Sequence, residues 1–140
     1  MKKYRFFVWV LLAVAGCQPS SLEEFQMEGT AQMRLLLQDL RRIESREDLL
    51  SLLPALQKRF DKLVDLMIEA RSFQQKNGDQ EISFQEVNPV LNQSLLEELR
   101  RVYALEGGRE CLEKAQKEPM LRLAVKEKAL EKQRGLSRGK

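Results

Sequence analysis

Thiols are the side chains in this sequence best suited to covalent chemistry, and there are two of them, Cys17 and Cys111. Cys17 follows an unbroken apolar run, Phe6–Ala15, and positively charged residues precede that run. The order of charged, apolar and small-residue regions is the layout of a secretory signal peptide. The sequence therefore predicts export, with Cys17 at the end of the export signal.

The residues Val14-Ala15-Gly16-Cys17 resemble the lipobox of bacterial lipoproteins. The resemblance implies that the Cys17 thiol takes a diacylglyceryl group, that a dedicated signal peptidase cuts just before it, and that the new amino terminus is acylated as well. Since Gln18 stands where an Asp favours inner-membrane retention in some bacteria, the resemblance favours the outer membrane. An uncleaved anchor is the weaker alternative, because a membrane-spanning helix needs about 20 apolar residues.

A second candidate site lies between two expected helices, where side chains with oxygen atoms alternate over residues 75–86. This stretch is similar to the second half of an EF-hand calcium loop whose twelfth position is Glu86. Gln75 stands where the first Asp ligand belongs, and Gln80 replaces the Gly that makes the sharp turn. A polar helix connector is therefore the default interpretation. The candidate calcium ligands are Asn77, Asp79, Glu81 and Glu86.

The sequence favours no enzyme and no cofactor beyond the lipid on Cys17. It contains no His, which removes the commonest general base and the commonest zinc ligand. Adjacent carboxylates such as Glu97 and Glu98 point in different directions on a helix, so they form no acid–base pair. Lipidation of Cys17 leaves Cys111 without an internal partner. We interpret Cys111 as a small buried apolar residue, with intermolecular pairing as the alternative.

The net charge of +3 belongs entirely to the export signal, because Lys2, Lys3 and Arg5 account for it. The mature chain is charge-balanced, which argues against nucleic acid as a partner. Within it, residues 114–140 carry nine basic and three acidic residues. This basic tail can be a solvated helix end, or it can contact anionic lipid or an acidic partner. Acyl chains on Cys17 suffice for anchoring, so solvation or a protein partner is favoured.

Four amphipathic stretches follow the anchor, expected as helices over 22–44, 46–77, 89–106 and 109–133. Ser45 and Asn88 are expected N-caps, and Asn77-Gly78 and Gly107-Gly108 are expected stops. Pro54 predicts either a kink or a restart of the second helix. The first two stripes expected to pack are Met33, Leu36, Leu40 and Ile43, and Leu49, Leu53, Leu56, Phe60, Leu63, Met67 and Ala70. The third is Leu91, Leu95, Leu99 and Val102, with Leu96, Tyr103 and Leu105 widening its face, and the fourth helix has Leu112, Ala115, Met120, Leu123 and Leu130 at helical spacing.

We therefore predict an all-α fold: a three- to four-helix antiparallel bundle, or helical hairpins, after a cleaved N-terminal signal peptide. The expected division is signal peptide 1–16, lipidated Cys and linker 17–21, helical domain 22–133 and disordered basic tail 134–140. The first functional hypothesis is an envelope lipoprotein with an interaction or structural domain, which contacts a partner or itself through its helical stripes. The alternatives are a surface-exposed lipoprotein of a host-associated bacterium, used in adhesion or immune contact, and an EF-hand-like calcium-binding protein.

Overall fold

The structure, a computed structural model, describes residues 19–78 and 88–139. Its four helices are α2 (Leu22–Arg41), α3 (Arg46–Asn77), α4 (Pro89–Tyr103) and α5 (Gly108–Arg138). No strand occurs in these two stretches. The prediction of an all-α fold is confirmed.

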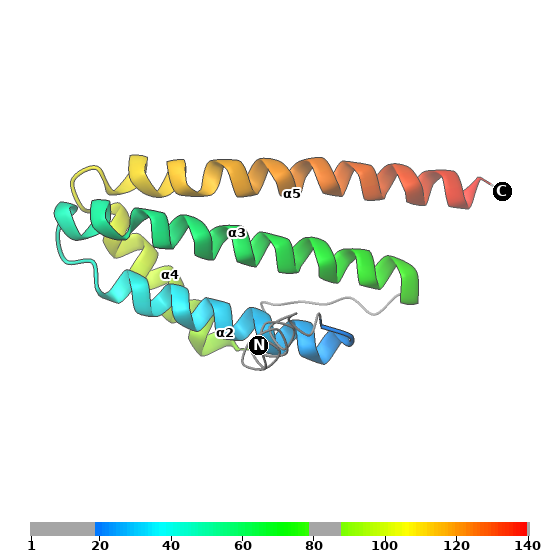
Figure 1. The fold of residues 1–140 in the computed structure, drawn as a ribbon, viewed down its shortest axis with the longest axis horizontal. Coiled ribbons are helices and arrows are strands. Elements are labelled where there is room, and N and C mark those ends of the chain that lie inside the picture. The colour runs from blue at the N-terminus through cyan, green and yellow to red at the C-terminus, as the bar shows by residue number, and fades with distance from the viewer. Residues whose placement is uncertain (1–18, 79–87, 140) are drawn as a thin grey trace, which may run out of the picture.

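The four helices form two hairpins that pack side by side (Figure 1). In the first hairpin α2 and α3 run in opposite directions, and in the second α4 is steeply inclined to α5 and leads into it through a tight turn. The hairpins meet along α3 and α5, which run in the same direction, and along α2 and α4. The predicted helical bundle is therefore confirmed, and it is built from hairpins whose helices α3 and α5 run parallel to each other.

Side-chain caps explain where three of the helices begin. The Ser21 hydroxyl accepts from the Glu24 amide at the start of α2, and the Asn88 side chain accepts from the Leu91 amide before α4. At the start of α3, Ser45 and Asp48 form a reciprocal capping box. Each cap satisfies amide groups that have no partner within the helix. The caps expected at Ser45 and Asn88 are confirmed.

Two of the predicted helices end earlier in the structure. α2 ends at Arg41, where 44 is expected, because the Arg42 and Ile43 amides bond back to Asp39 and Leu40 and tighten the last turn. α4 ends at Tyr103, where 106 is expected.

α3 passes through Pro54 as one helix, so the predicted restart at that residue is wrong. Pro54 leaves the carbonyl oxygen of Leu50 without its helical donor, but both residues are exposed, and water can bond that oxygen. α5 likewise passes through Pro119.

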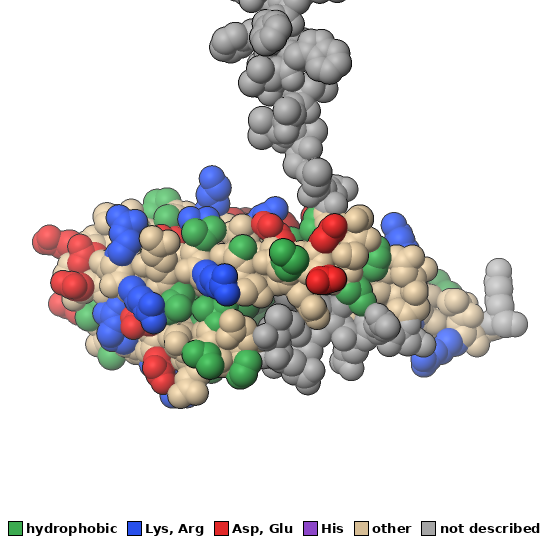
Figure 2. All heavy atoms as spheres, turned by 90° about the horizontal axis from the view of Figure 1, so that it is seen from below, with side chains coloured by type: hydrophobic (Ala, Val, Ile, Leu, Met, Phe, Trp, Pro, Cys, Tyr) green, Lys and Arg blue, Asp and Glu red, His purple; other side chains and the backbone are tan. Residues whose placement is uncertain are grey.

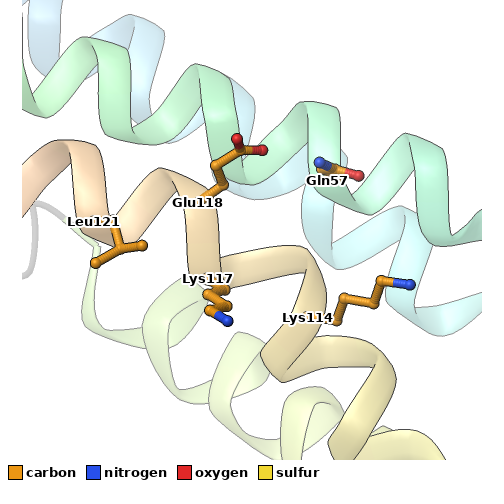
Figure 3. A pocket seen from close by; sticks show the side chains of 5 residues that line it. All are labelled: Gln57, Lys114, Lys117, Glu118 and Leu121. Carbon is orange, nitrogen blue, oxygen red and sulfur yellow. The ribbon is translucent and has the colours of Figure 1, made fainter.

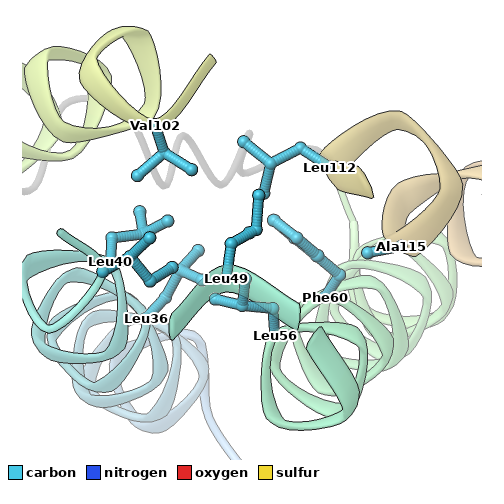
Figure 4. Close-up of a cluster of buried hydrophobic side chains, with 9 residues drawn as sticks. Leu36, Leu40, Leu49, Leu56, Phe60, Val102, Leu112 and Ala115 are labelled. Atoms are coloured by element: carbon cyan, nitrogen blue, oxygen red, sulfur yellow. The ribbon is translucent and has the colours of Figure 1, made fainter. Parts of the chain in front are cut away.

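The main core lies where all four helices meet (Figure 4). Leucines from α2 and α3 interlock there with residues of α4 and α5, and most of the predicted stripes face inward. Leu96 and Met120 are exceptions, because 54% and 55% of their surfaces are exposed. The core consists of Leu36, Leu40, Ile43, Leu49, Leu56, Phe60, Val102, Leu112 and Ala115.

A second, smaller core joins the first turn of α2 to the last turns of α3. Phe25 packs there with Leu66 and Ala70, and its ring centroid lies 5.7 Å from that of Phe73. This cluster fixes the beginning of α2 against the end of α3. Of its residues only Ala70 belongs to a predicted stripe, whereas Phe25, Leu66 and Phe73 do not.

The turn between α4 and α5 depends on two glycines. Gly107 has a φ of 71°, in the left-handed region that glycine adopts without strain. A Cβ on Gly108 would overlap the carbonyl oxygen of Val102. The predicted tight reversal at Gly107-Gly108 is confirmed.

The expectation of a disordered tail over 134–140 differs from the structure, in which α5 continues to Arg138. Arg134, Leu136 and Arg138 are good helix formers, and over the helical part of this stretch they outnumber the weaker formers Gly135 and Ser137. Arg138 in the last turn also faces the negative end of the helix dipole.

Candidate interaction surface

The predicted lipidation site and most of the predicted calcium ligands lie outside the described residues. These are Cys17, Asp79, Glu81 and Glu86. Asn77 is described and exposed, and its side chain donates to the carbonyl oxygen of Phe73 at 3.1 Å. Within residues 19–78 and 88–139, no group of three or more acidic, Cys or His side chains could hold a metal ion.

The predicted helical stripes are not free to meet a partner, because most of their residues form the core. Leu49, Leu56 and Ala70 of α3 are buried against the neighbouring helices. A partner surface must therefore be sought among the apolar side chains that remain exposed.

α5 carries the main exposed apolar row. The buried face of α5 is a different stripe, which packs against α3 and consists of Leu112, Ala115, Pro119 and Leu123. Leu121 and Val125 lie off that stripe and are 57% and 69% exposed. Their four-residue spacing places both on one side of the helix.

These two residues line a shallow groove of about 400 Å³ between α3 and α5. Ile68 contributes from α3, and Ala129 extends the apolar floor along α5. Glu118, Arg122 and Lys126 form the polar edge. The groove is open to solvent along its length, so it suits an elongated apolar segment better than an enclosed small molecule.

A second hollow, of about 360 Å³, continues the groove toward the start of α5. Figure 3 shows Lys114, Lys117, Glu118 and Leu121 of α5 around it, with Gln57 on α3 opposite. Glu118 and Leu121 belong to both hollows. Together they form one continuous surface, which we call the α3/α5 groove.

Ion pairs between α3 and α5 hold the groove in register. The Arg122 guanidinium lies 2.7 Å from Asp61 and 2.9 Å from Asp65, and Arg71 pairs with Glu127 one helical turn further along. Because Arg122 already forms ion pairs with two carboxylates, its positive charge is balanced within the domain. The groove lysines Lys114, Lys117 and Lys126 form no ion pair with another described residue.

Two further arginines make polar contacts elsewhere, Arg59 within the first hairpin and Arg101 between the two hairpins. Arg59 of α3 bonds Asp39 of α2 at 3.1 Å, and Asp39 is 8% exposed. Arg101 of α4 donates to the carbonyl oxygens of Ile43 and Leu40 at 2.6 and 2.9 Å. These arginines have structural roles that sequence reasoning missed.

Two carboxyl groups at the starts of helices have lowered pKa values. The amide of Glu44 and the hydroxyl and amide of Ser45 lower the pKa of Asp48 by donating to its carboxylate. Ser20 and Ser21 lower the pKa of Glu24 in the same way. These two shifts describe capping rather than catalysis.

Cys111 is a free, partly buried thiol on the first turn of α5. It packs against the main core. Cys111 is thus only partly buried, where a buried side chain is expected, and it packs with the apolar residues of the core.

Comparison with protein-family models, curated proteins and solved structures gives no match to this chain. Among residues 19–78 and 88–139, none of the helices combines the length and apolar character that a membrane crossing needs. The function is therefore argued from the chain's own residues.

Proposed function

We propose that the protein is a bacterial envelope lipoprotein, in which an acylated Cys17 anchors a small helical interaction domain to a membrane. The observation that carries this proposal is the order of the basic start, the apolar run and Val14-Ala15-Gly16-Cys17. Residues 18–21 alone separate Cys17 from α2, so the domain is held close to its anchor.

The α3/α5 groove is the proposed interaction surface of this domain. Its floor of Ile68, Leu121 and Val125 offers apolar contact, while Lys114 and Lys126 give its rim a positive charge. An amphipathic helix with one apolar row and acidic flanks fits both properties. The proposed partner is therefore an acidic amphipathic helix of another envelope protein.

Metabolic labelling with a clickable fatty acid tests the anchor. Cells producing the wild-type chain should yield a labelled protein, whereas Cys17→Ser should yield none, because the acceptor thiol is absent. Cys111→Ser is the matched control and should keep the label. Label that persists in Cys17→Ser would refute the lipoprotein proposal.

Photo-crosslinking in cells tests the groove. A photoreactive residue at Val125 should give a discrete adduct with a partner, and the same residue at Arg34, exposed on α2, should give none. Leu121→Glu should abolish the Val125 adduct by charging the groove floor. Equal adducts at both positions would contradict a specific surface.

Protease treatment of intact cells distinguishes a domain that faces the periplasm from one that is exposed on the cell surface. Resistance until the outer membrane is permeabilised is expected for a domain facing the periplasm. Cleavage in intact cells would instead support the adhesion or immune-contact alternative.

A further inference from the structure

The end of α5 is an exposed basic element, which we call the α5 tip. The tip comprises residues 128–138, of which all but the half-buried Leu130 are exposed. It contains one carboxylate, Glu131, and its cations form no ion pair with another described residue. In Figure 2 the charged side chains visible on the projecting end of the molecule are basic. The cations and the exposed large apolar side chain of the tip are Lys128, Lys132, Arg134, Leu136 and Arg138.

The tip lies at the end of the bundle where α2 begins (Figure 1). Phe25, in the first turn of α2, packs on Phe73 near the end of α3. Gln133 of α5 in turn contacts Gln75 of α3 at 3.5 Å. The chain therefore leaves toward Cys17 from the same end at which the basic tip projects.

The chain lengths keep this end close to the anchored membrane. The linker of residues 18–21 spans at most about 13 Å when extended. Beyond Gln133, residues 134–138 carry α5 roughly 7 Å further. An anchor at Cys17 thus holds the tip within reach of lipid headgroups.

We infer that the α5 tip docks on anionic lipid headgroups of the membrane that holds the Cys17 anchor. This inference rests on the proposed function. Lys128 and Lys132 lie on one side of α5 and can face lipid phosphates, while Leu136, 69% exposed, can enter the interfacial layer. Basic residues beside an exposed apolar side chain are typical of helices that bind membrane surfaces.

The same end of the bundle is acidic on its α2 side, which gives the docking a direction. Glu23 and Glu24 stand in the first turn of α2, and anionic headgroups repel both. The domain should therefore tilt so that α5, and not α2, contacts the membrane. The acyl chains attach the protein, and the tip sets its orientation.

A fluorescent probe on the tip tests this inference in the lipidated protein. The probe is placed at Ser137→Cys in a Cys111→Ala background, and the protein is incorporated into vesicles that carry a headgroup quencher. On vesicles of phosphatidylglycerol and phosphatidylcholine the probe should be quenched, and on pure phosphatidylcholine it should not. A probe at Glu110→Cys, at the other end of α5, should stay unquenched on both.

A charge-matched pair of variants shows whether the tip itself is responsible. Each basic residue near an anionic surface strengthens binding roughly fivefold, so the triple variant Lys128→Gln/Lys132→Gln/Arg134→Gln should weaken docking about a hundredfold. The variant Arg41→Gln/Arg42→Gln/Arg100→Gln loses the same charge at the opposite end and should keep the quenching. Equal loss in both variants would overturn the inference.

Lipidation is measured separately, by the mass of the amino-terminal peptide and by vesicle flotation. A protein without lipid on Cys17 would refute the proposed function. A lipidated protein that floats, but whose tip probe is not quenched on anionic vesicles, would overturn the docking alone. Circular dichroism of each variant confirms that it is folded.

Discussion

Arg101 of α4 donates to the main-chain carbonyl oxygen of Ile43, just beyond α2, at 2.6 Å. A second guanidinium nitrogen donates to the carbonyl oxygen of Leu40. The Nε atom of Arg101 also pairs with the carboxylate of Glu98 at 2.8 Å. The carbonyl groups at the end of a helix have no partner within it. One side chain of the second hairpin thus closes the end of a helix in the first.

Arg101→Gln should lower the free energy of unfolding by about 2 kcal/mol, because it removes two bonds from a charged donor to main-chain oxygens. Urea unfolding measures the loss. The neighbouring Arg100→Gln should change stability by less than about 0.5 kcal/mol, since Arg100 is exposed and has no ion pair with another described residue. Similar losses in both variants would contradict this role.

Gly108→Ala should destabilise the protein by about 1–3 kcal/mol, because its Cβ would overlap the carbonyl oxygen of Val102. Gly135→Ala is the matched change, since a Cβ there meets no atom within 4 Å. It should raise helix stability by about 0.5–1 kcal/mol. Thermal melting of the two variants should therefore shift in opposite directions.

Leu56→Ala should cost about 2–5 kcal/mol, because Leu56 is fully buried in the main core. Leu96→Ala deletes the same atoms from a side chain that is 54% exposed, and should change stability by less than about 0.5 kcal/mol. Urea midpoints compare the two. A large loss at Leu96 would instead support its predicted place in the core.

The capping box at the start of α3 makes the stability of the fold depend on pH. Hydrogen bonds lower the pKa of Asp48 below its ordinary 3.8 in the folded chain. A lowered pKa stabilises the fold above the unfolded value, and this stabilisation disappears as the pH falls through the folded value. Asp48→Asn should therefore lower the melting temperature at neutral pH, and its difference from wild type should shrink below pH 3.8.

Glu47→Gln is the control for Asp48→Asn, because Glu47 occupies the same turn and loses the same charge but takes no part in the capping box. Its effect at neutral pH should be the smaller of the two. An equal effect would assign the stabilisation to the helix dipole rather than to the cap.

Local signals predicted most of the helices. Ser45 and Asn88 mark helix starts because their side chains can accept from early amides, and Gly107 marks a turn because it tolerates a positive φ. These properties belong to a few neighbouring residues, so the sequence exposes them directly. The extension of α5 to Arg138 was missed because a charged, weakly periodic segment was interpreted as unstructured.

The candidate surface was harder to predict, because it depends on which helices become neighbours. Leu121 and Val125 are as apolar as core residues, and only their position off the Leu112–Leu123 stripe distinguishes them. Arg122 meets Asp61 and Asp65 only because α5 packs beside α3. Arg101 donates to main-chain oxygens, which every residue has. No pattern of side chains in the sequence therefore predicts this contact.

The parallel pairing of α3 with α5 also bears on how the chain folds. Each hairpin forms from segments adjacent in sequence, whereas α5 meets α3 only after the intervening α4 has formed and reversed. Contacts between distant segments form at a greater loss of chain entropy than local ones. We therefore expect hairpin formation to precede docking of the hairpins, so that the contact between α3 and α5 limits the folding rate.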